Sequence, residues 1–326
     1  MPLVSRTFAL CIRFLPADLE WSVLVAYLLC RVADTIEDAA EPPPEEKRRL
    51  LGVFRDAVDD PARPIAALTD AFAHSASDDE RLAAHADAVL RAFTRLPAEE
   101  RAAIAPWVHE MCDGMAQFAE GTAAGPGRFR ALPDLESLDR YCYYVAGTVG
   151  HLLTRLFRIR FPAGHPAGER LEGLATSFGL GLQLTNIIKD VAADRRRGWS
   201  FVPRDLCQLS GISPEELCDP QRRAEGRQVM TTLIDRARTH LDDAITYCTL
   251  LPHRAYGIRV FCLTSVYLAI RTLELAAQDA QLLDPGHTVK ITRRQVYRSV
   301  AMTHLVAPSN RLIRRYYRHL APTLLR

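Results

Sequence analysis

The segment VADTIEDAA ends an otherwise apolar stretch with three acidic residues, Asp34, Glu37 and Asp38. Carboxylates are rarely buried unless they are paired with a cation or bind a metal. The preceding run WSVLVAYLLC predicts a buried helix, and a helix turns by about 100° per residue. One helix face, about 60° wide with Glu37 on its flank, therefore carries Tyr27, Arg31, Asp34 and Asp38. Such a face can bind a cation, although a lone DxxED is more often the solvated end of a helix.

A second acidic helix face favours the cation-binding interpretation. The segment LGLQLTNIIKDVAAD places four polar side chains within about 80° of arc, namely Gln183, Asn186, Asp190 and Asp194. Asp190 and Asp194 lie one turn apart and repel each other unless a cation lies between them. Both faces offer hard oxygen ligands, which favours Mg²⁺ over zinc. Mg²⁺ takes one or two carboxylates directly and completes its shell with water and phosphate oxygens.

Basic residues lie beside both acidic faces. They are Arg6 next to Ser5, Arg31, Lys189, Arg195, Arg196 and Arg197. Carboxylates, Mg²⁺ and arginines together suit a diphosphate, because the metal neutralises a leaving group and a guanidinium binds its oxygens in forked geometry. The three consecutive arginines have an alternative interpretation as a solvated helix end, where the helix dipole favours positive charge.

The segment LDRYCYYVAGTVGHLLTRLF predicts a third helix that combines tyrosines with small residues. Ala146, Gly147 and Gly150 permit close helix packing. Tyr141 and Tyr144 occupy neighbouring positions of one face. A tyrosine in such a helix is usually a packing residue, but next to a departing diphosphate its ring can stabilise a carbocation or its hydroxyl can move a proton.

Almost every periodic segment has the helical period, and no run alternates as a strand does. We therefore predict an all-α protein with a single all-helical domain over residues 1–326. The predicted helices cover roughly residues 18–40, 44–58, 79–95, 98–122, 135–160, 168–196, 221–250, 253–279 and 291–318. Turns rich in Pro and Gly, such as EPPPEE and LLDPGHT, separate them.

The composition is that of a soluble globular protein, with 48% hydrophobic and 25% charged residues and a formal net charge of +2. This balance gives no support for nucleic-acid binding. The eight cysteines form no CxxC pair, which predicts reduced, buried thiols in a cytoplasmic protein. No signal peptide is recognisable, and the longest apolar runs are shorter than the roughly 20 residues of a membrane-spanning helix. The basic amphipathic C-terminus predicts a solvated last helix, with peripheral contact to an anionic membrane as the less favoured alternative.

These motifs resemble those of the squalene/phytoene synthase family, the head-to-head branch of the all-helical isoprenoid synthases. The matching segments cover nearly the whole chain and are SRTFALCIRFLP, YLLCRVADTIED, YCYYVAGTVGHLLTRLF, GLQLTNIIKDVAAD and GIRVFCLTSVYLAIRTL. Because of GIRVFC and HTVKITRRQV, the chain is more similar to squalene synthases than to phytoene synthases. The sequence ends without the C-terminal anchor of eukaryotic members, so we expect the soluble bacterial type, with an apolar channel between its helices.

The resemblance implies roles for individual residues. The implied metal ligands are Asp34, Glu37, Asp38, Asn186, Asp190 and Asp194. The implied catalytic residues are Asp34, Asp38, Asp190, Asp194 and, for proton handling, Tyr141. The implied substrate-binding residues are Ser5, Arg6, Tyr27, Arg31, Gln183, Asn186, Phe261 and Cys262. The implied cofactor-binding residues are Asn186, Lys290 and Arg293.

The resemblance also implies an activity. It is the Mg²⁺-dependent condensation of two farnesyl diphosphates to presqualene diphosphate, followed by NADPH-dependent reduction to squalene, a step of sterol or hopanoid biosynthesis. The alternatives are a related enzyme that makes phytoene, dehydrosqualene or presqualene diphosphate, and a non-catalytic helical assembly partner. The intact acidic motifs argue against the last of these.

One position departs from the family pattern. After the second acidic motif, family members carry an arginine directly behind a glycine. Here RRRGWSFVP has Trp199 at that position. One of the preceding arginines, Arg195, Arg196 or Arg197, is expected to replace the missing diphosphate contact.

Overall fold

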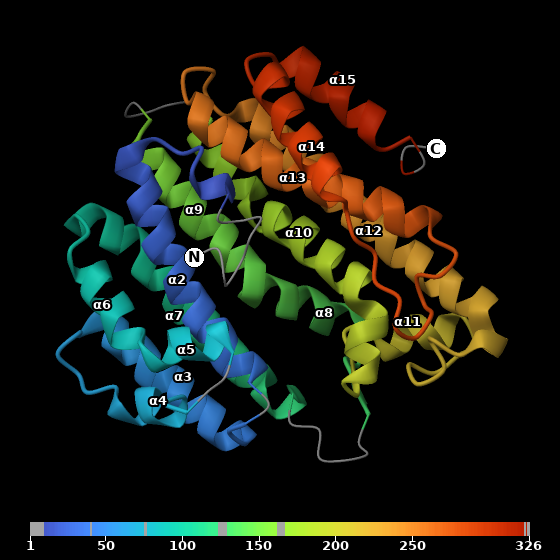
Figure 1. Ribbon diagram of the computed structural model, residues 1–326, viewed down its shortest axis with the longest axis horizontal. Helices are drawn as coiled ribbons and strands as arrows, with labels where there is room; N and C mark the ends of the chain where they lie inside the picture. The colour runs from blue at the N-terminus through green and yellow to red at the C-terminus, as the bar shows by residue number, and fades with distance from the viewer. Residues whose placement is uncertain are drawn as a thin grey trace.

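The chain folds into helices that pack around a shared apolar interior (Figure 1). The computed structural model describes residues 10–39, 41–74, 77–122, 129–161, 167–322 and 324. The long helices are α2 (Ala17–Asp38), α3 (Pro44–Asp59), α7 (Ala98–Thr122), α10 (Gly168–Arg196), α12 (Arg223–Leu250) and α13 (Tyr256–Gln278). The shorter ones are α4 (Ala66–Ala71), α5 (Asp78–Ala84), α6 (Ala86–Thr94), α8 (Leu135–Cys142), η1 (Tyr143–Gly147), α9 (Thr148–Ile159), α11 (Arg204–Leu209), η2 (Pro220–Arg222), α14 (Arg293–Val306) and α15 (Asn310–Leu320). The predicted all-α class is confirmed.

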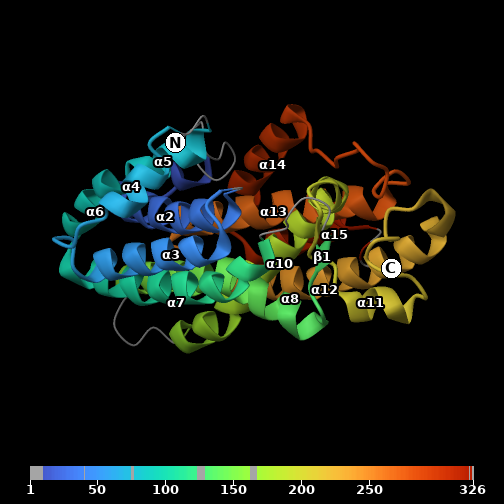
Figure 2. The ribbon, with the colours of Figure 1, turned by 90° about the horizontal axis from the view of Figure 1, so that it is seen from below.

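Helix α10 is the central element that the other helices surround. Figures 1 and 2 show it between the N-terminal helices α2 to α7 and the C-terminal helices α12 and α13. It contacts α9, η1, α12 and α13 directly. Residues from all of these elements can therefore line a space beside α10.

Two predicted helices are each divided into two in the structure. The predicted helix 79–95 is α5 and α6, which meet at His85, where the backbone leaves helical geometry. The predicted helix 291–318 is α14 and α15. Pro308 lies between them, and a proline lacks the N–H that a continuing helix needs. Ser309 then caps α15 by accepting a hydrogen bond from the Leu312 backbone N–H.

The predicted third helix contains a short π-helical segment. Residues 143–147, YYVAG, form the π-turn η1 between α8 and α9. Small residues let this segment press against α10. A Cβ on Gly179 would lie 2.2 Å from the Ala146 carbonyl oxygen, and one on Gly150 would lie 2.1 Å from the Ala175 carbonyl oxygen. π-Turns within α-helices occur often at functional sites, so this closely packed region is a candidate part of one.

A short strand pair was not predicted from the sequence. Strands β1 (Arg130–Ala131) and β2 (Trp199–Ser200) pair in parallel. Two residues are too few to show the alternation that identifies a strand. The pair fixes the segment that follows the acidic end of α10, including Trp199.

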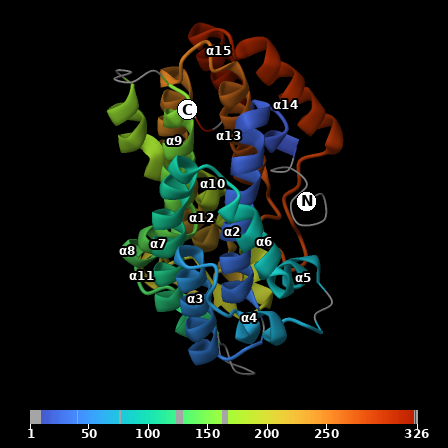
Figure 3. The ribbon, with the colours of Figure 1, turned by 90° about the vertical axis from the view of Figure 1, so that its left-hand side faces the viewer.

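The interior is apolar and contains reduced thiols, as expected. All eight cysteines are free, and seven of them are buried. Within the described residues one helix, α13, is long and apolar enough to cross a membrane, but 78% of that stretch is buried inside the protein. Such burial is typical of a core helix. At the edge of the molecule, α14 and α15 lie outside α13 (Figure 3).

Candidate active site

The first acidic cluster lies at the C-terminal end of α2 and contains a buried, unpaired carboxylate. Glu37 is 1% exposed, and among the described residues neither of its carboxylate oxygens has a hydrogen-bond partner. Burial and the charges of Asp38 and Asp34 raise the pKa of Glu37 well above its usual range. Burial and Asp38 also raise the pKa of Asp34 to about 7, despite an ion pair with Arg31. This cluster is electrostatically unfavourable on its own and would be stabilised by an added cation.

Two neighbours of this cluster were not predicted. Arg31 donates hydrogen bonds to both carboxylate oxygens of Asp79 on α5, at 3.2 Å from Nε and 2.6 Å from Nη2. Lys47 on α3 is 2% exposed and donates from Nζ to the Glu37 carbonyl oxygen at 2.7 Å. The sequence signal for Asp79 was the helix start SDDE, in which Ser77 accepts from the Glu80 backbone N–H. Arg31 is thus held in place between the acidic cluster and Asp79.

The second acidic cluster lies near the C-terminal end of α10 and has its own cations. Asp190 is paired with Lys189, and the buried Asp194 is paired with Arg197. Burial raises the pKa of Asp194, although Arg197 partly offsets this effect. Burial lowers the pKa of Arg197, but the ion pair with Asp194 and the charges of Asp38 and Asp190 raise it overall. Because Asp38 belongs to the first cluster, Arg197 connects the two acidic clusters electrostatically.

Among the three arginines, the structure separates Arg197 from Arg195. The Arg195 guanidinium lies 4.4 Å above the Phe129 ring and donates to the Glu215 carbonyl oxygen at 2.8 Å. Arg196 borders a surface hollow together with Asp190 and Arg197. Only Arg197 among these three forms an ion pair with an acidic-cluster residue within the described chain.

Tyr141 lies next to the first acidic cluster inside an aromatic stack. Its ring is stacked on Phe201 at 4.8 Å and meets the Phe118 ring edge-on at 5.4 Å. Burial and the negative charges of Glu37, Asp38 and Asp34 raise the pKa of Tyr141 well above its usual range. Trp199, the residue that replaces the family arginine, packs edge-on against Phe201 at 5.5 Å. The substitution therefore extends the aromatic wall around Tyr141.

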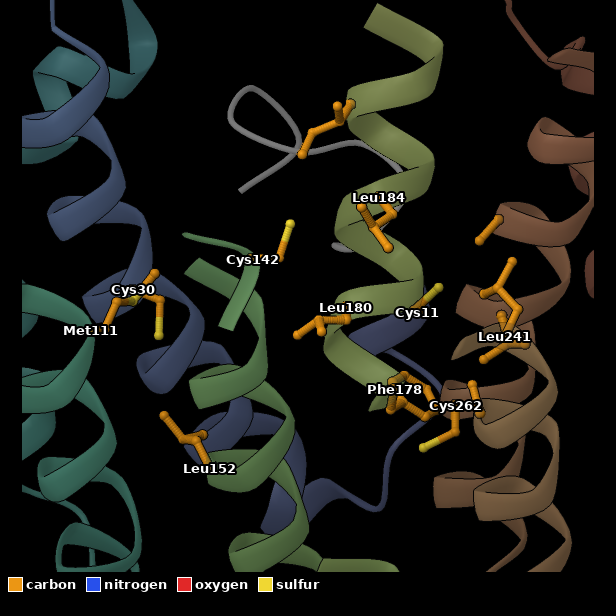
Figure 4. Packing of buried hydrophobic residues seen from close by; sticks show 14 of the residues in the cluster. Cys11, Cys30, Met111, Cys142, Leu152, Phe178, Leu180, Leu184, Leu241 and Cys262 are labelled. Carbon is orange, nitrogen blue, oxygen red and sulfur yellow. The ribbon is translucent and has the colours of Figure 1, made fainter. Parts of the chain in front are cut away.

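A cavity of about 350 Å³ extends from the first cluster into the apolar interior. Its polar end is formed by Tyr27, Arg31, Asp34 and Gln183. Its apolar walls come from α2, α7, η1, α9, α10 and α13 and include Val23, Met111, Val149, Leu153, Phe178 and Phe261. Figure 4 shows Cys30, Met111 and Leu152 on one side of this region and Phe178 on the other. The cavity is polar at one end and apolar along the rest, as an amphiphilic substrate requires.

A second cavity of about 400 Å³ adjoins the first. Leu182 and Ser265 line both. The second cavity is lined further by Asn186, Lys189 and Lys290, together with apolar residues of α13. Two neighbouring spaces therefore lie along α10 and α13, each with polar groups and an apolar lining.

The remaining predicted residues lie in different surroundings. Phe261 lines the first cavity, whereas Cys262 is 2% exposed and its thiol lies beside Cys248 in the core. Arg293 is exposed at the start of α14 and is not among the residues that line either cavity. Ser5 and Arg6 lie outside the described residues.

The acidic side chains fit a Mg²⁺ ion whose ligands come partly from the protein and partly from the substrate. Within the described chain, no three His, Cys, Asp or Glu side chains converge as a complete metal cage. The unpartnered Glu37 oxygens and the mutually repelling carboxylates of α2 are nevertheless groups that a cation would satisfy. Mg²⁺ commonly uses few protein ligands and takes the rest from water and phosphate. The residues that would hold it are those of the two acidic clusters.

Comparison with known proteins places these features in context. The model of the family described as Squalene/phytoene synthase matches residues 1–295. The chain is 28% identical over 295 residues to the squalene synthase of Schizosaccharomyces pombe and 30% identical over 291 residues to that of Mus musculus. These matches cover 90% and 89% of this chain but 62% and 65% of the relatives, so the chain spans under two thirds of their length. The solved structure of TcSQS with the ligand BPH1237 superposes with a TM-score of 0.81 at 26% identity, covering 99% of this chain and 89% of that one.

Proposed function

Since the chain belongs to the squalene/phytoene synthase family, we propose that it condenses two farnesyl diphosphates head to head and reduces the product to squalene. In the first half-reaction the C1–O bond of one substrate breaks, and diphosphate leaves with the bonding electron pair. The double bond of the second substrate then attacks C1. Loss of a proton closes a cyclopropane and gives presqualene diphosphate. In the second half-reaction this product would lose its diphosphate and rearrange, and NADPH, when bound, would supply the hydride that completes the reduction.

The observation that supports this function best is the pair of adjoining cavities, which share Leu182 and Ser265. A condensation of two prenyl chains needs two apolar spaces that meet near the reacting carbons. The first acidic cluster lies at the polar end of one cavity, and Asn186 and Lys189 line the other. This arrangement lets each substrate keep its diphosphate at the polar end while the chains lie among apolar residues.

The residues of this chain have separate tasks in the proposed reaction. Mg²⁺, when bound by the two acidic clusters, would neutralise the departing diphosphate, an effect worth several kcal/mol of the barrier. Arg31, positioned by Asp79, and Arg197 would bind diphosphate oxygens. The apolar walls exclude water from the carbocations. The Tyr141 hydroxyl, beside the first cluster, would carry the proton lost during cyclopropane closure.

NADPH would supply the hydride of the second half-reaction, and we propose that it binds beside Lys290, next to the part of the second cavity that holds the prenyl chain. Asn186 and Lys290 both line this cavity, and a lysine ammonium suits a phosphate oxygen. Arg293 follows Lys290 by three residues and is exposed at the start of α14. From there its side chain would contact the solvent-facing part of a bound dinucleotide.

A product assay tests the proposal. Purified protein is incubated with Mg²⁺ and farnesyl diphosphate, with and without NADPH, and the hydrocarbons are identified. We expect squalene with NADPH and presqualene diphosphate or dehydrosqualene without it. Phytoene from the C20 diphosphate would move the assignment to the phytoene branch. If neither the C15 nor the C20 substrate releases diphosphate, the chain is a non-catalytic partner and the proposal is wrong.

A second candidate, favoured by Trp199, is an enzyme that stops at presqualene diphosphate. Trp199 packs on Phe201 and lacks a charge with which to hold the second departing diphosphate. In that case added NADPH leaves the product unchanged. Accumulation of presqualene diphosphate in the same assay, at saturating NADPH, identifies this candidate.

A further inference from the structure

The charges of the chain are distributed very unevenly along its length. The last 42 residues, 285–326, contain nine Lys or Arg and no Asp or Glu, so the first 284 residues carry a net charge of −7. The described part of this basic stretch forms α14 and α15. A single-sign field of this kind attracts an oppositely charged partner over roughly 10 Å at ordinary ionic strength.

The outer face of α14 combines this charge with exposed apolar side chains. The exposed residues Arg294, Tyr297, Arg298 and Leu305 follow the helical period and lie within about 100° of arc. Tyr297 and Leu305 are each 68% exposed, whereas Ser299, Thr303 and Val306 on the opposite side are buried. Large apolar side chains that are exposed between arginines are typical of helices that lie in a membrane interface.

Contacts from α13 hold α14 in place, and α15 carries further exposed arginines. Tyr256 at the start of α13 is 41% exposed, and its hydroxyl is 2.8 Å from Nδ1 of His304 on α14. The buried Arg259 donates to the Ala307 carbonyl oxygen at 2.7 Å and to Asn310 at 2.6 Å, which fixes the junction between α14 and α15. On α15 the exposed stripe consists of Arg311, Arg314, Arg315 and Arg318.

The position of α14 relative to the cavities suggests what the surface is for. Val289, Lys290 and Ile291 line the second cavity, and α14 begins two residues later at Arg293. A surface that lies in the membrane interface at this point brings the second cavity next to lipid. An apolar product leaving the cavity would then enter the bilayer without crossing water.

We propose that the outer face of α14, formed by Arg294, Tyr297, Arg298 and Leu305, binds the surface of an anionic lipid bilayer. This inference goes beyond the proposed reaction and does not depend on it. The arginines are attracted to anionic headgroups, and each one near the surface raises the membrane partition coefficient about fivefold. Tyr297 and Leu305 insert at the level of the headgroups and acyl boundary.

Vesicle sedimentation tests this proposal with the full chain. We expect binding to vesicles of phosphatidylglycerol and phosphatidylcholine, and at least tenfold weaker binding to phosphatidylcholine alone or in high salt. Arg294→Gln with Arg298→Gln should lower partitioning about 20-fold. Tyr297→Ser with Leu305→Ser should lower it about tenfold and remove the residual binding in high salt.

Matched controls use equally exposed residues elsewhere. Leu209 on α11 is 81% exposed, and Leu209→Ser should leave partitioning unchanged. Arg95→Gln with Arg170→Gln removes the same number of exposed charges from other surfaces and should have less than a threefold effect. Equal losses in the control and α14 variants would overturn the proposal. So would vesicle binding too weak to detect, or α14 substitutions that alter self-association or nucleic-acid binding but not lipid binding.

Discussion

The two acidic clusters are similar in composition but differ in how completely their carboxylates are paired with cations. On α2, neither Glu37 carboxylate oxygen has a hydrogen-bond partner within the described residues, and burial keeps the pKa values of Glu37 and Asp34 raised although Lys47 and Arg31 lie close by. On α10, Lys189 and Arg197 already pair with Asp190 and Asp194. We therefore expect an added cation to stabilise the α2 cluster more than the α10 cluster, whose carboxylates already pair with Lys189 and Arg197.

The largest expected effect follows from removing one carboxylate from each cluster. Asp34→Ala and Asp190→Ala should each lower kcat for condensation at least about 1000-fold, because metal-ion neutralisation contributes several kcal/mol. Circular dichroism should remain unchanged, and Asp70→Ala on the exposed side of α4 should keep full activity. Near-normal turnover of either variant across a Mg²⁺ titration would show that its cluster does not bind the catalytic ion.

Next in size is the effect of the tyrosine beside the α2 cluster. Tyr141→Phe should lower the rate of presqualene diphosphate formation by about 100-fold or more, as expected when a proton-transfer group is lost. The rate is measured in single turnovers with farnesyl diphosphate and no NADPH. Tyr144→Phe is the comparison variant, since Tyr144 lies in the adjoining π-turn and packs against Phe118. A loss confined to Tyr144→Phe would move the proton-handling role to Tyr144.

A smaller effect is expected from the cation of the α10 cluster. Arg197→Gln should weaken the binding of inorganic pyrophosphate with Mg²⁺ about tenfold, measured by calorimetry, because one charge-assisted contact is lost. Arg195→Gln is the matched control, since Arg195 lies over Phe129 and pairs with the Glu215 carbonyl. Equal effects of the two substitutions would mean that Arg197 attracts pyrophosphate only through its positive charge and makes no direct contact with it.

Periodicity and residue type were sufficient to predict the long helices and both acidic clusters, but not the breaks at His85 and Pro308 or the π-turn. The faces of α2 and α10 follow from helical geometry alone, since an i, i+4 spacing places carboxylates on one face. The partners from other helices could not be predicted in this way. Asp79 and Lys47 reach the α2 cluster from α5 and α3, and that proximity depends on packing. The same limit applies to Cys262. It directly follows Phe261 on α13, but Phe261 lines the cavity whereas Cys262 lies in the core.

The unequal electrostatics also predict a difference in stability between the clusters. Burial raises the pKa of Glu37, so folding opposes ionisation of this carboxyl, and this destabilisation is present at every pH above the usual glutamate range. At neutral pH without Mg²⁺, Glu37→Gln should therefore raise the free energy of unfolding by about 1–2 kcal/mol and Tm by a few degrees. Asp194→Asn instead leaves Arg197 without its partner and should lower Tm or leave it unchanged. Thermal unfolding in EDTA measures both.

With Mg²⁺ and pyrophosphate added, ligand binding should stabilise the unmodified chain more than the Glu37→Gln variant, because Glu37 then has a cation to bind. A Glu37→Gln variant that is less stable in EDTA would mean that the carboxylate already has a favourable environment, and the contrast between the clusters would fail.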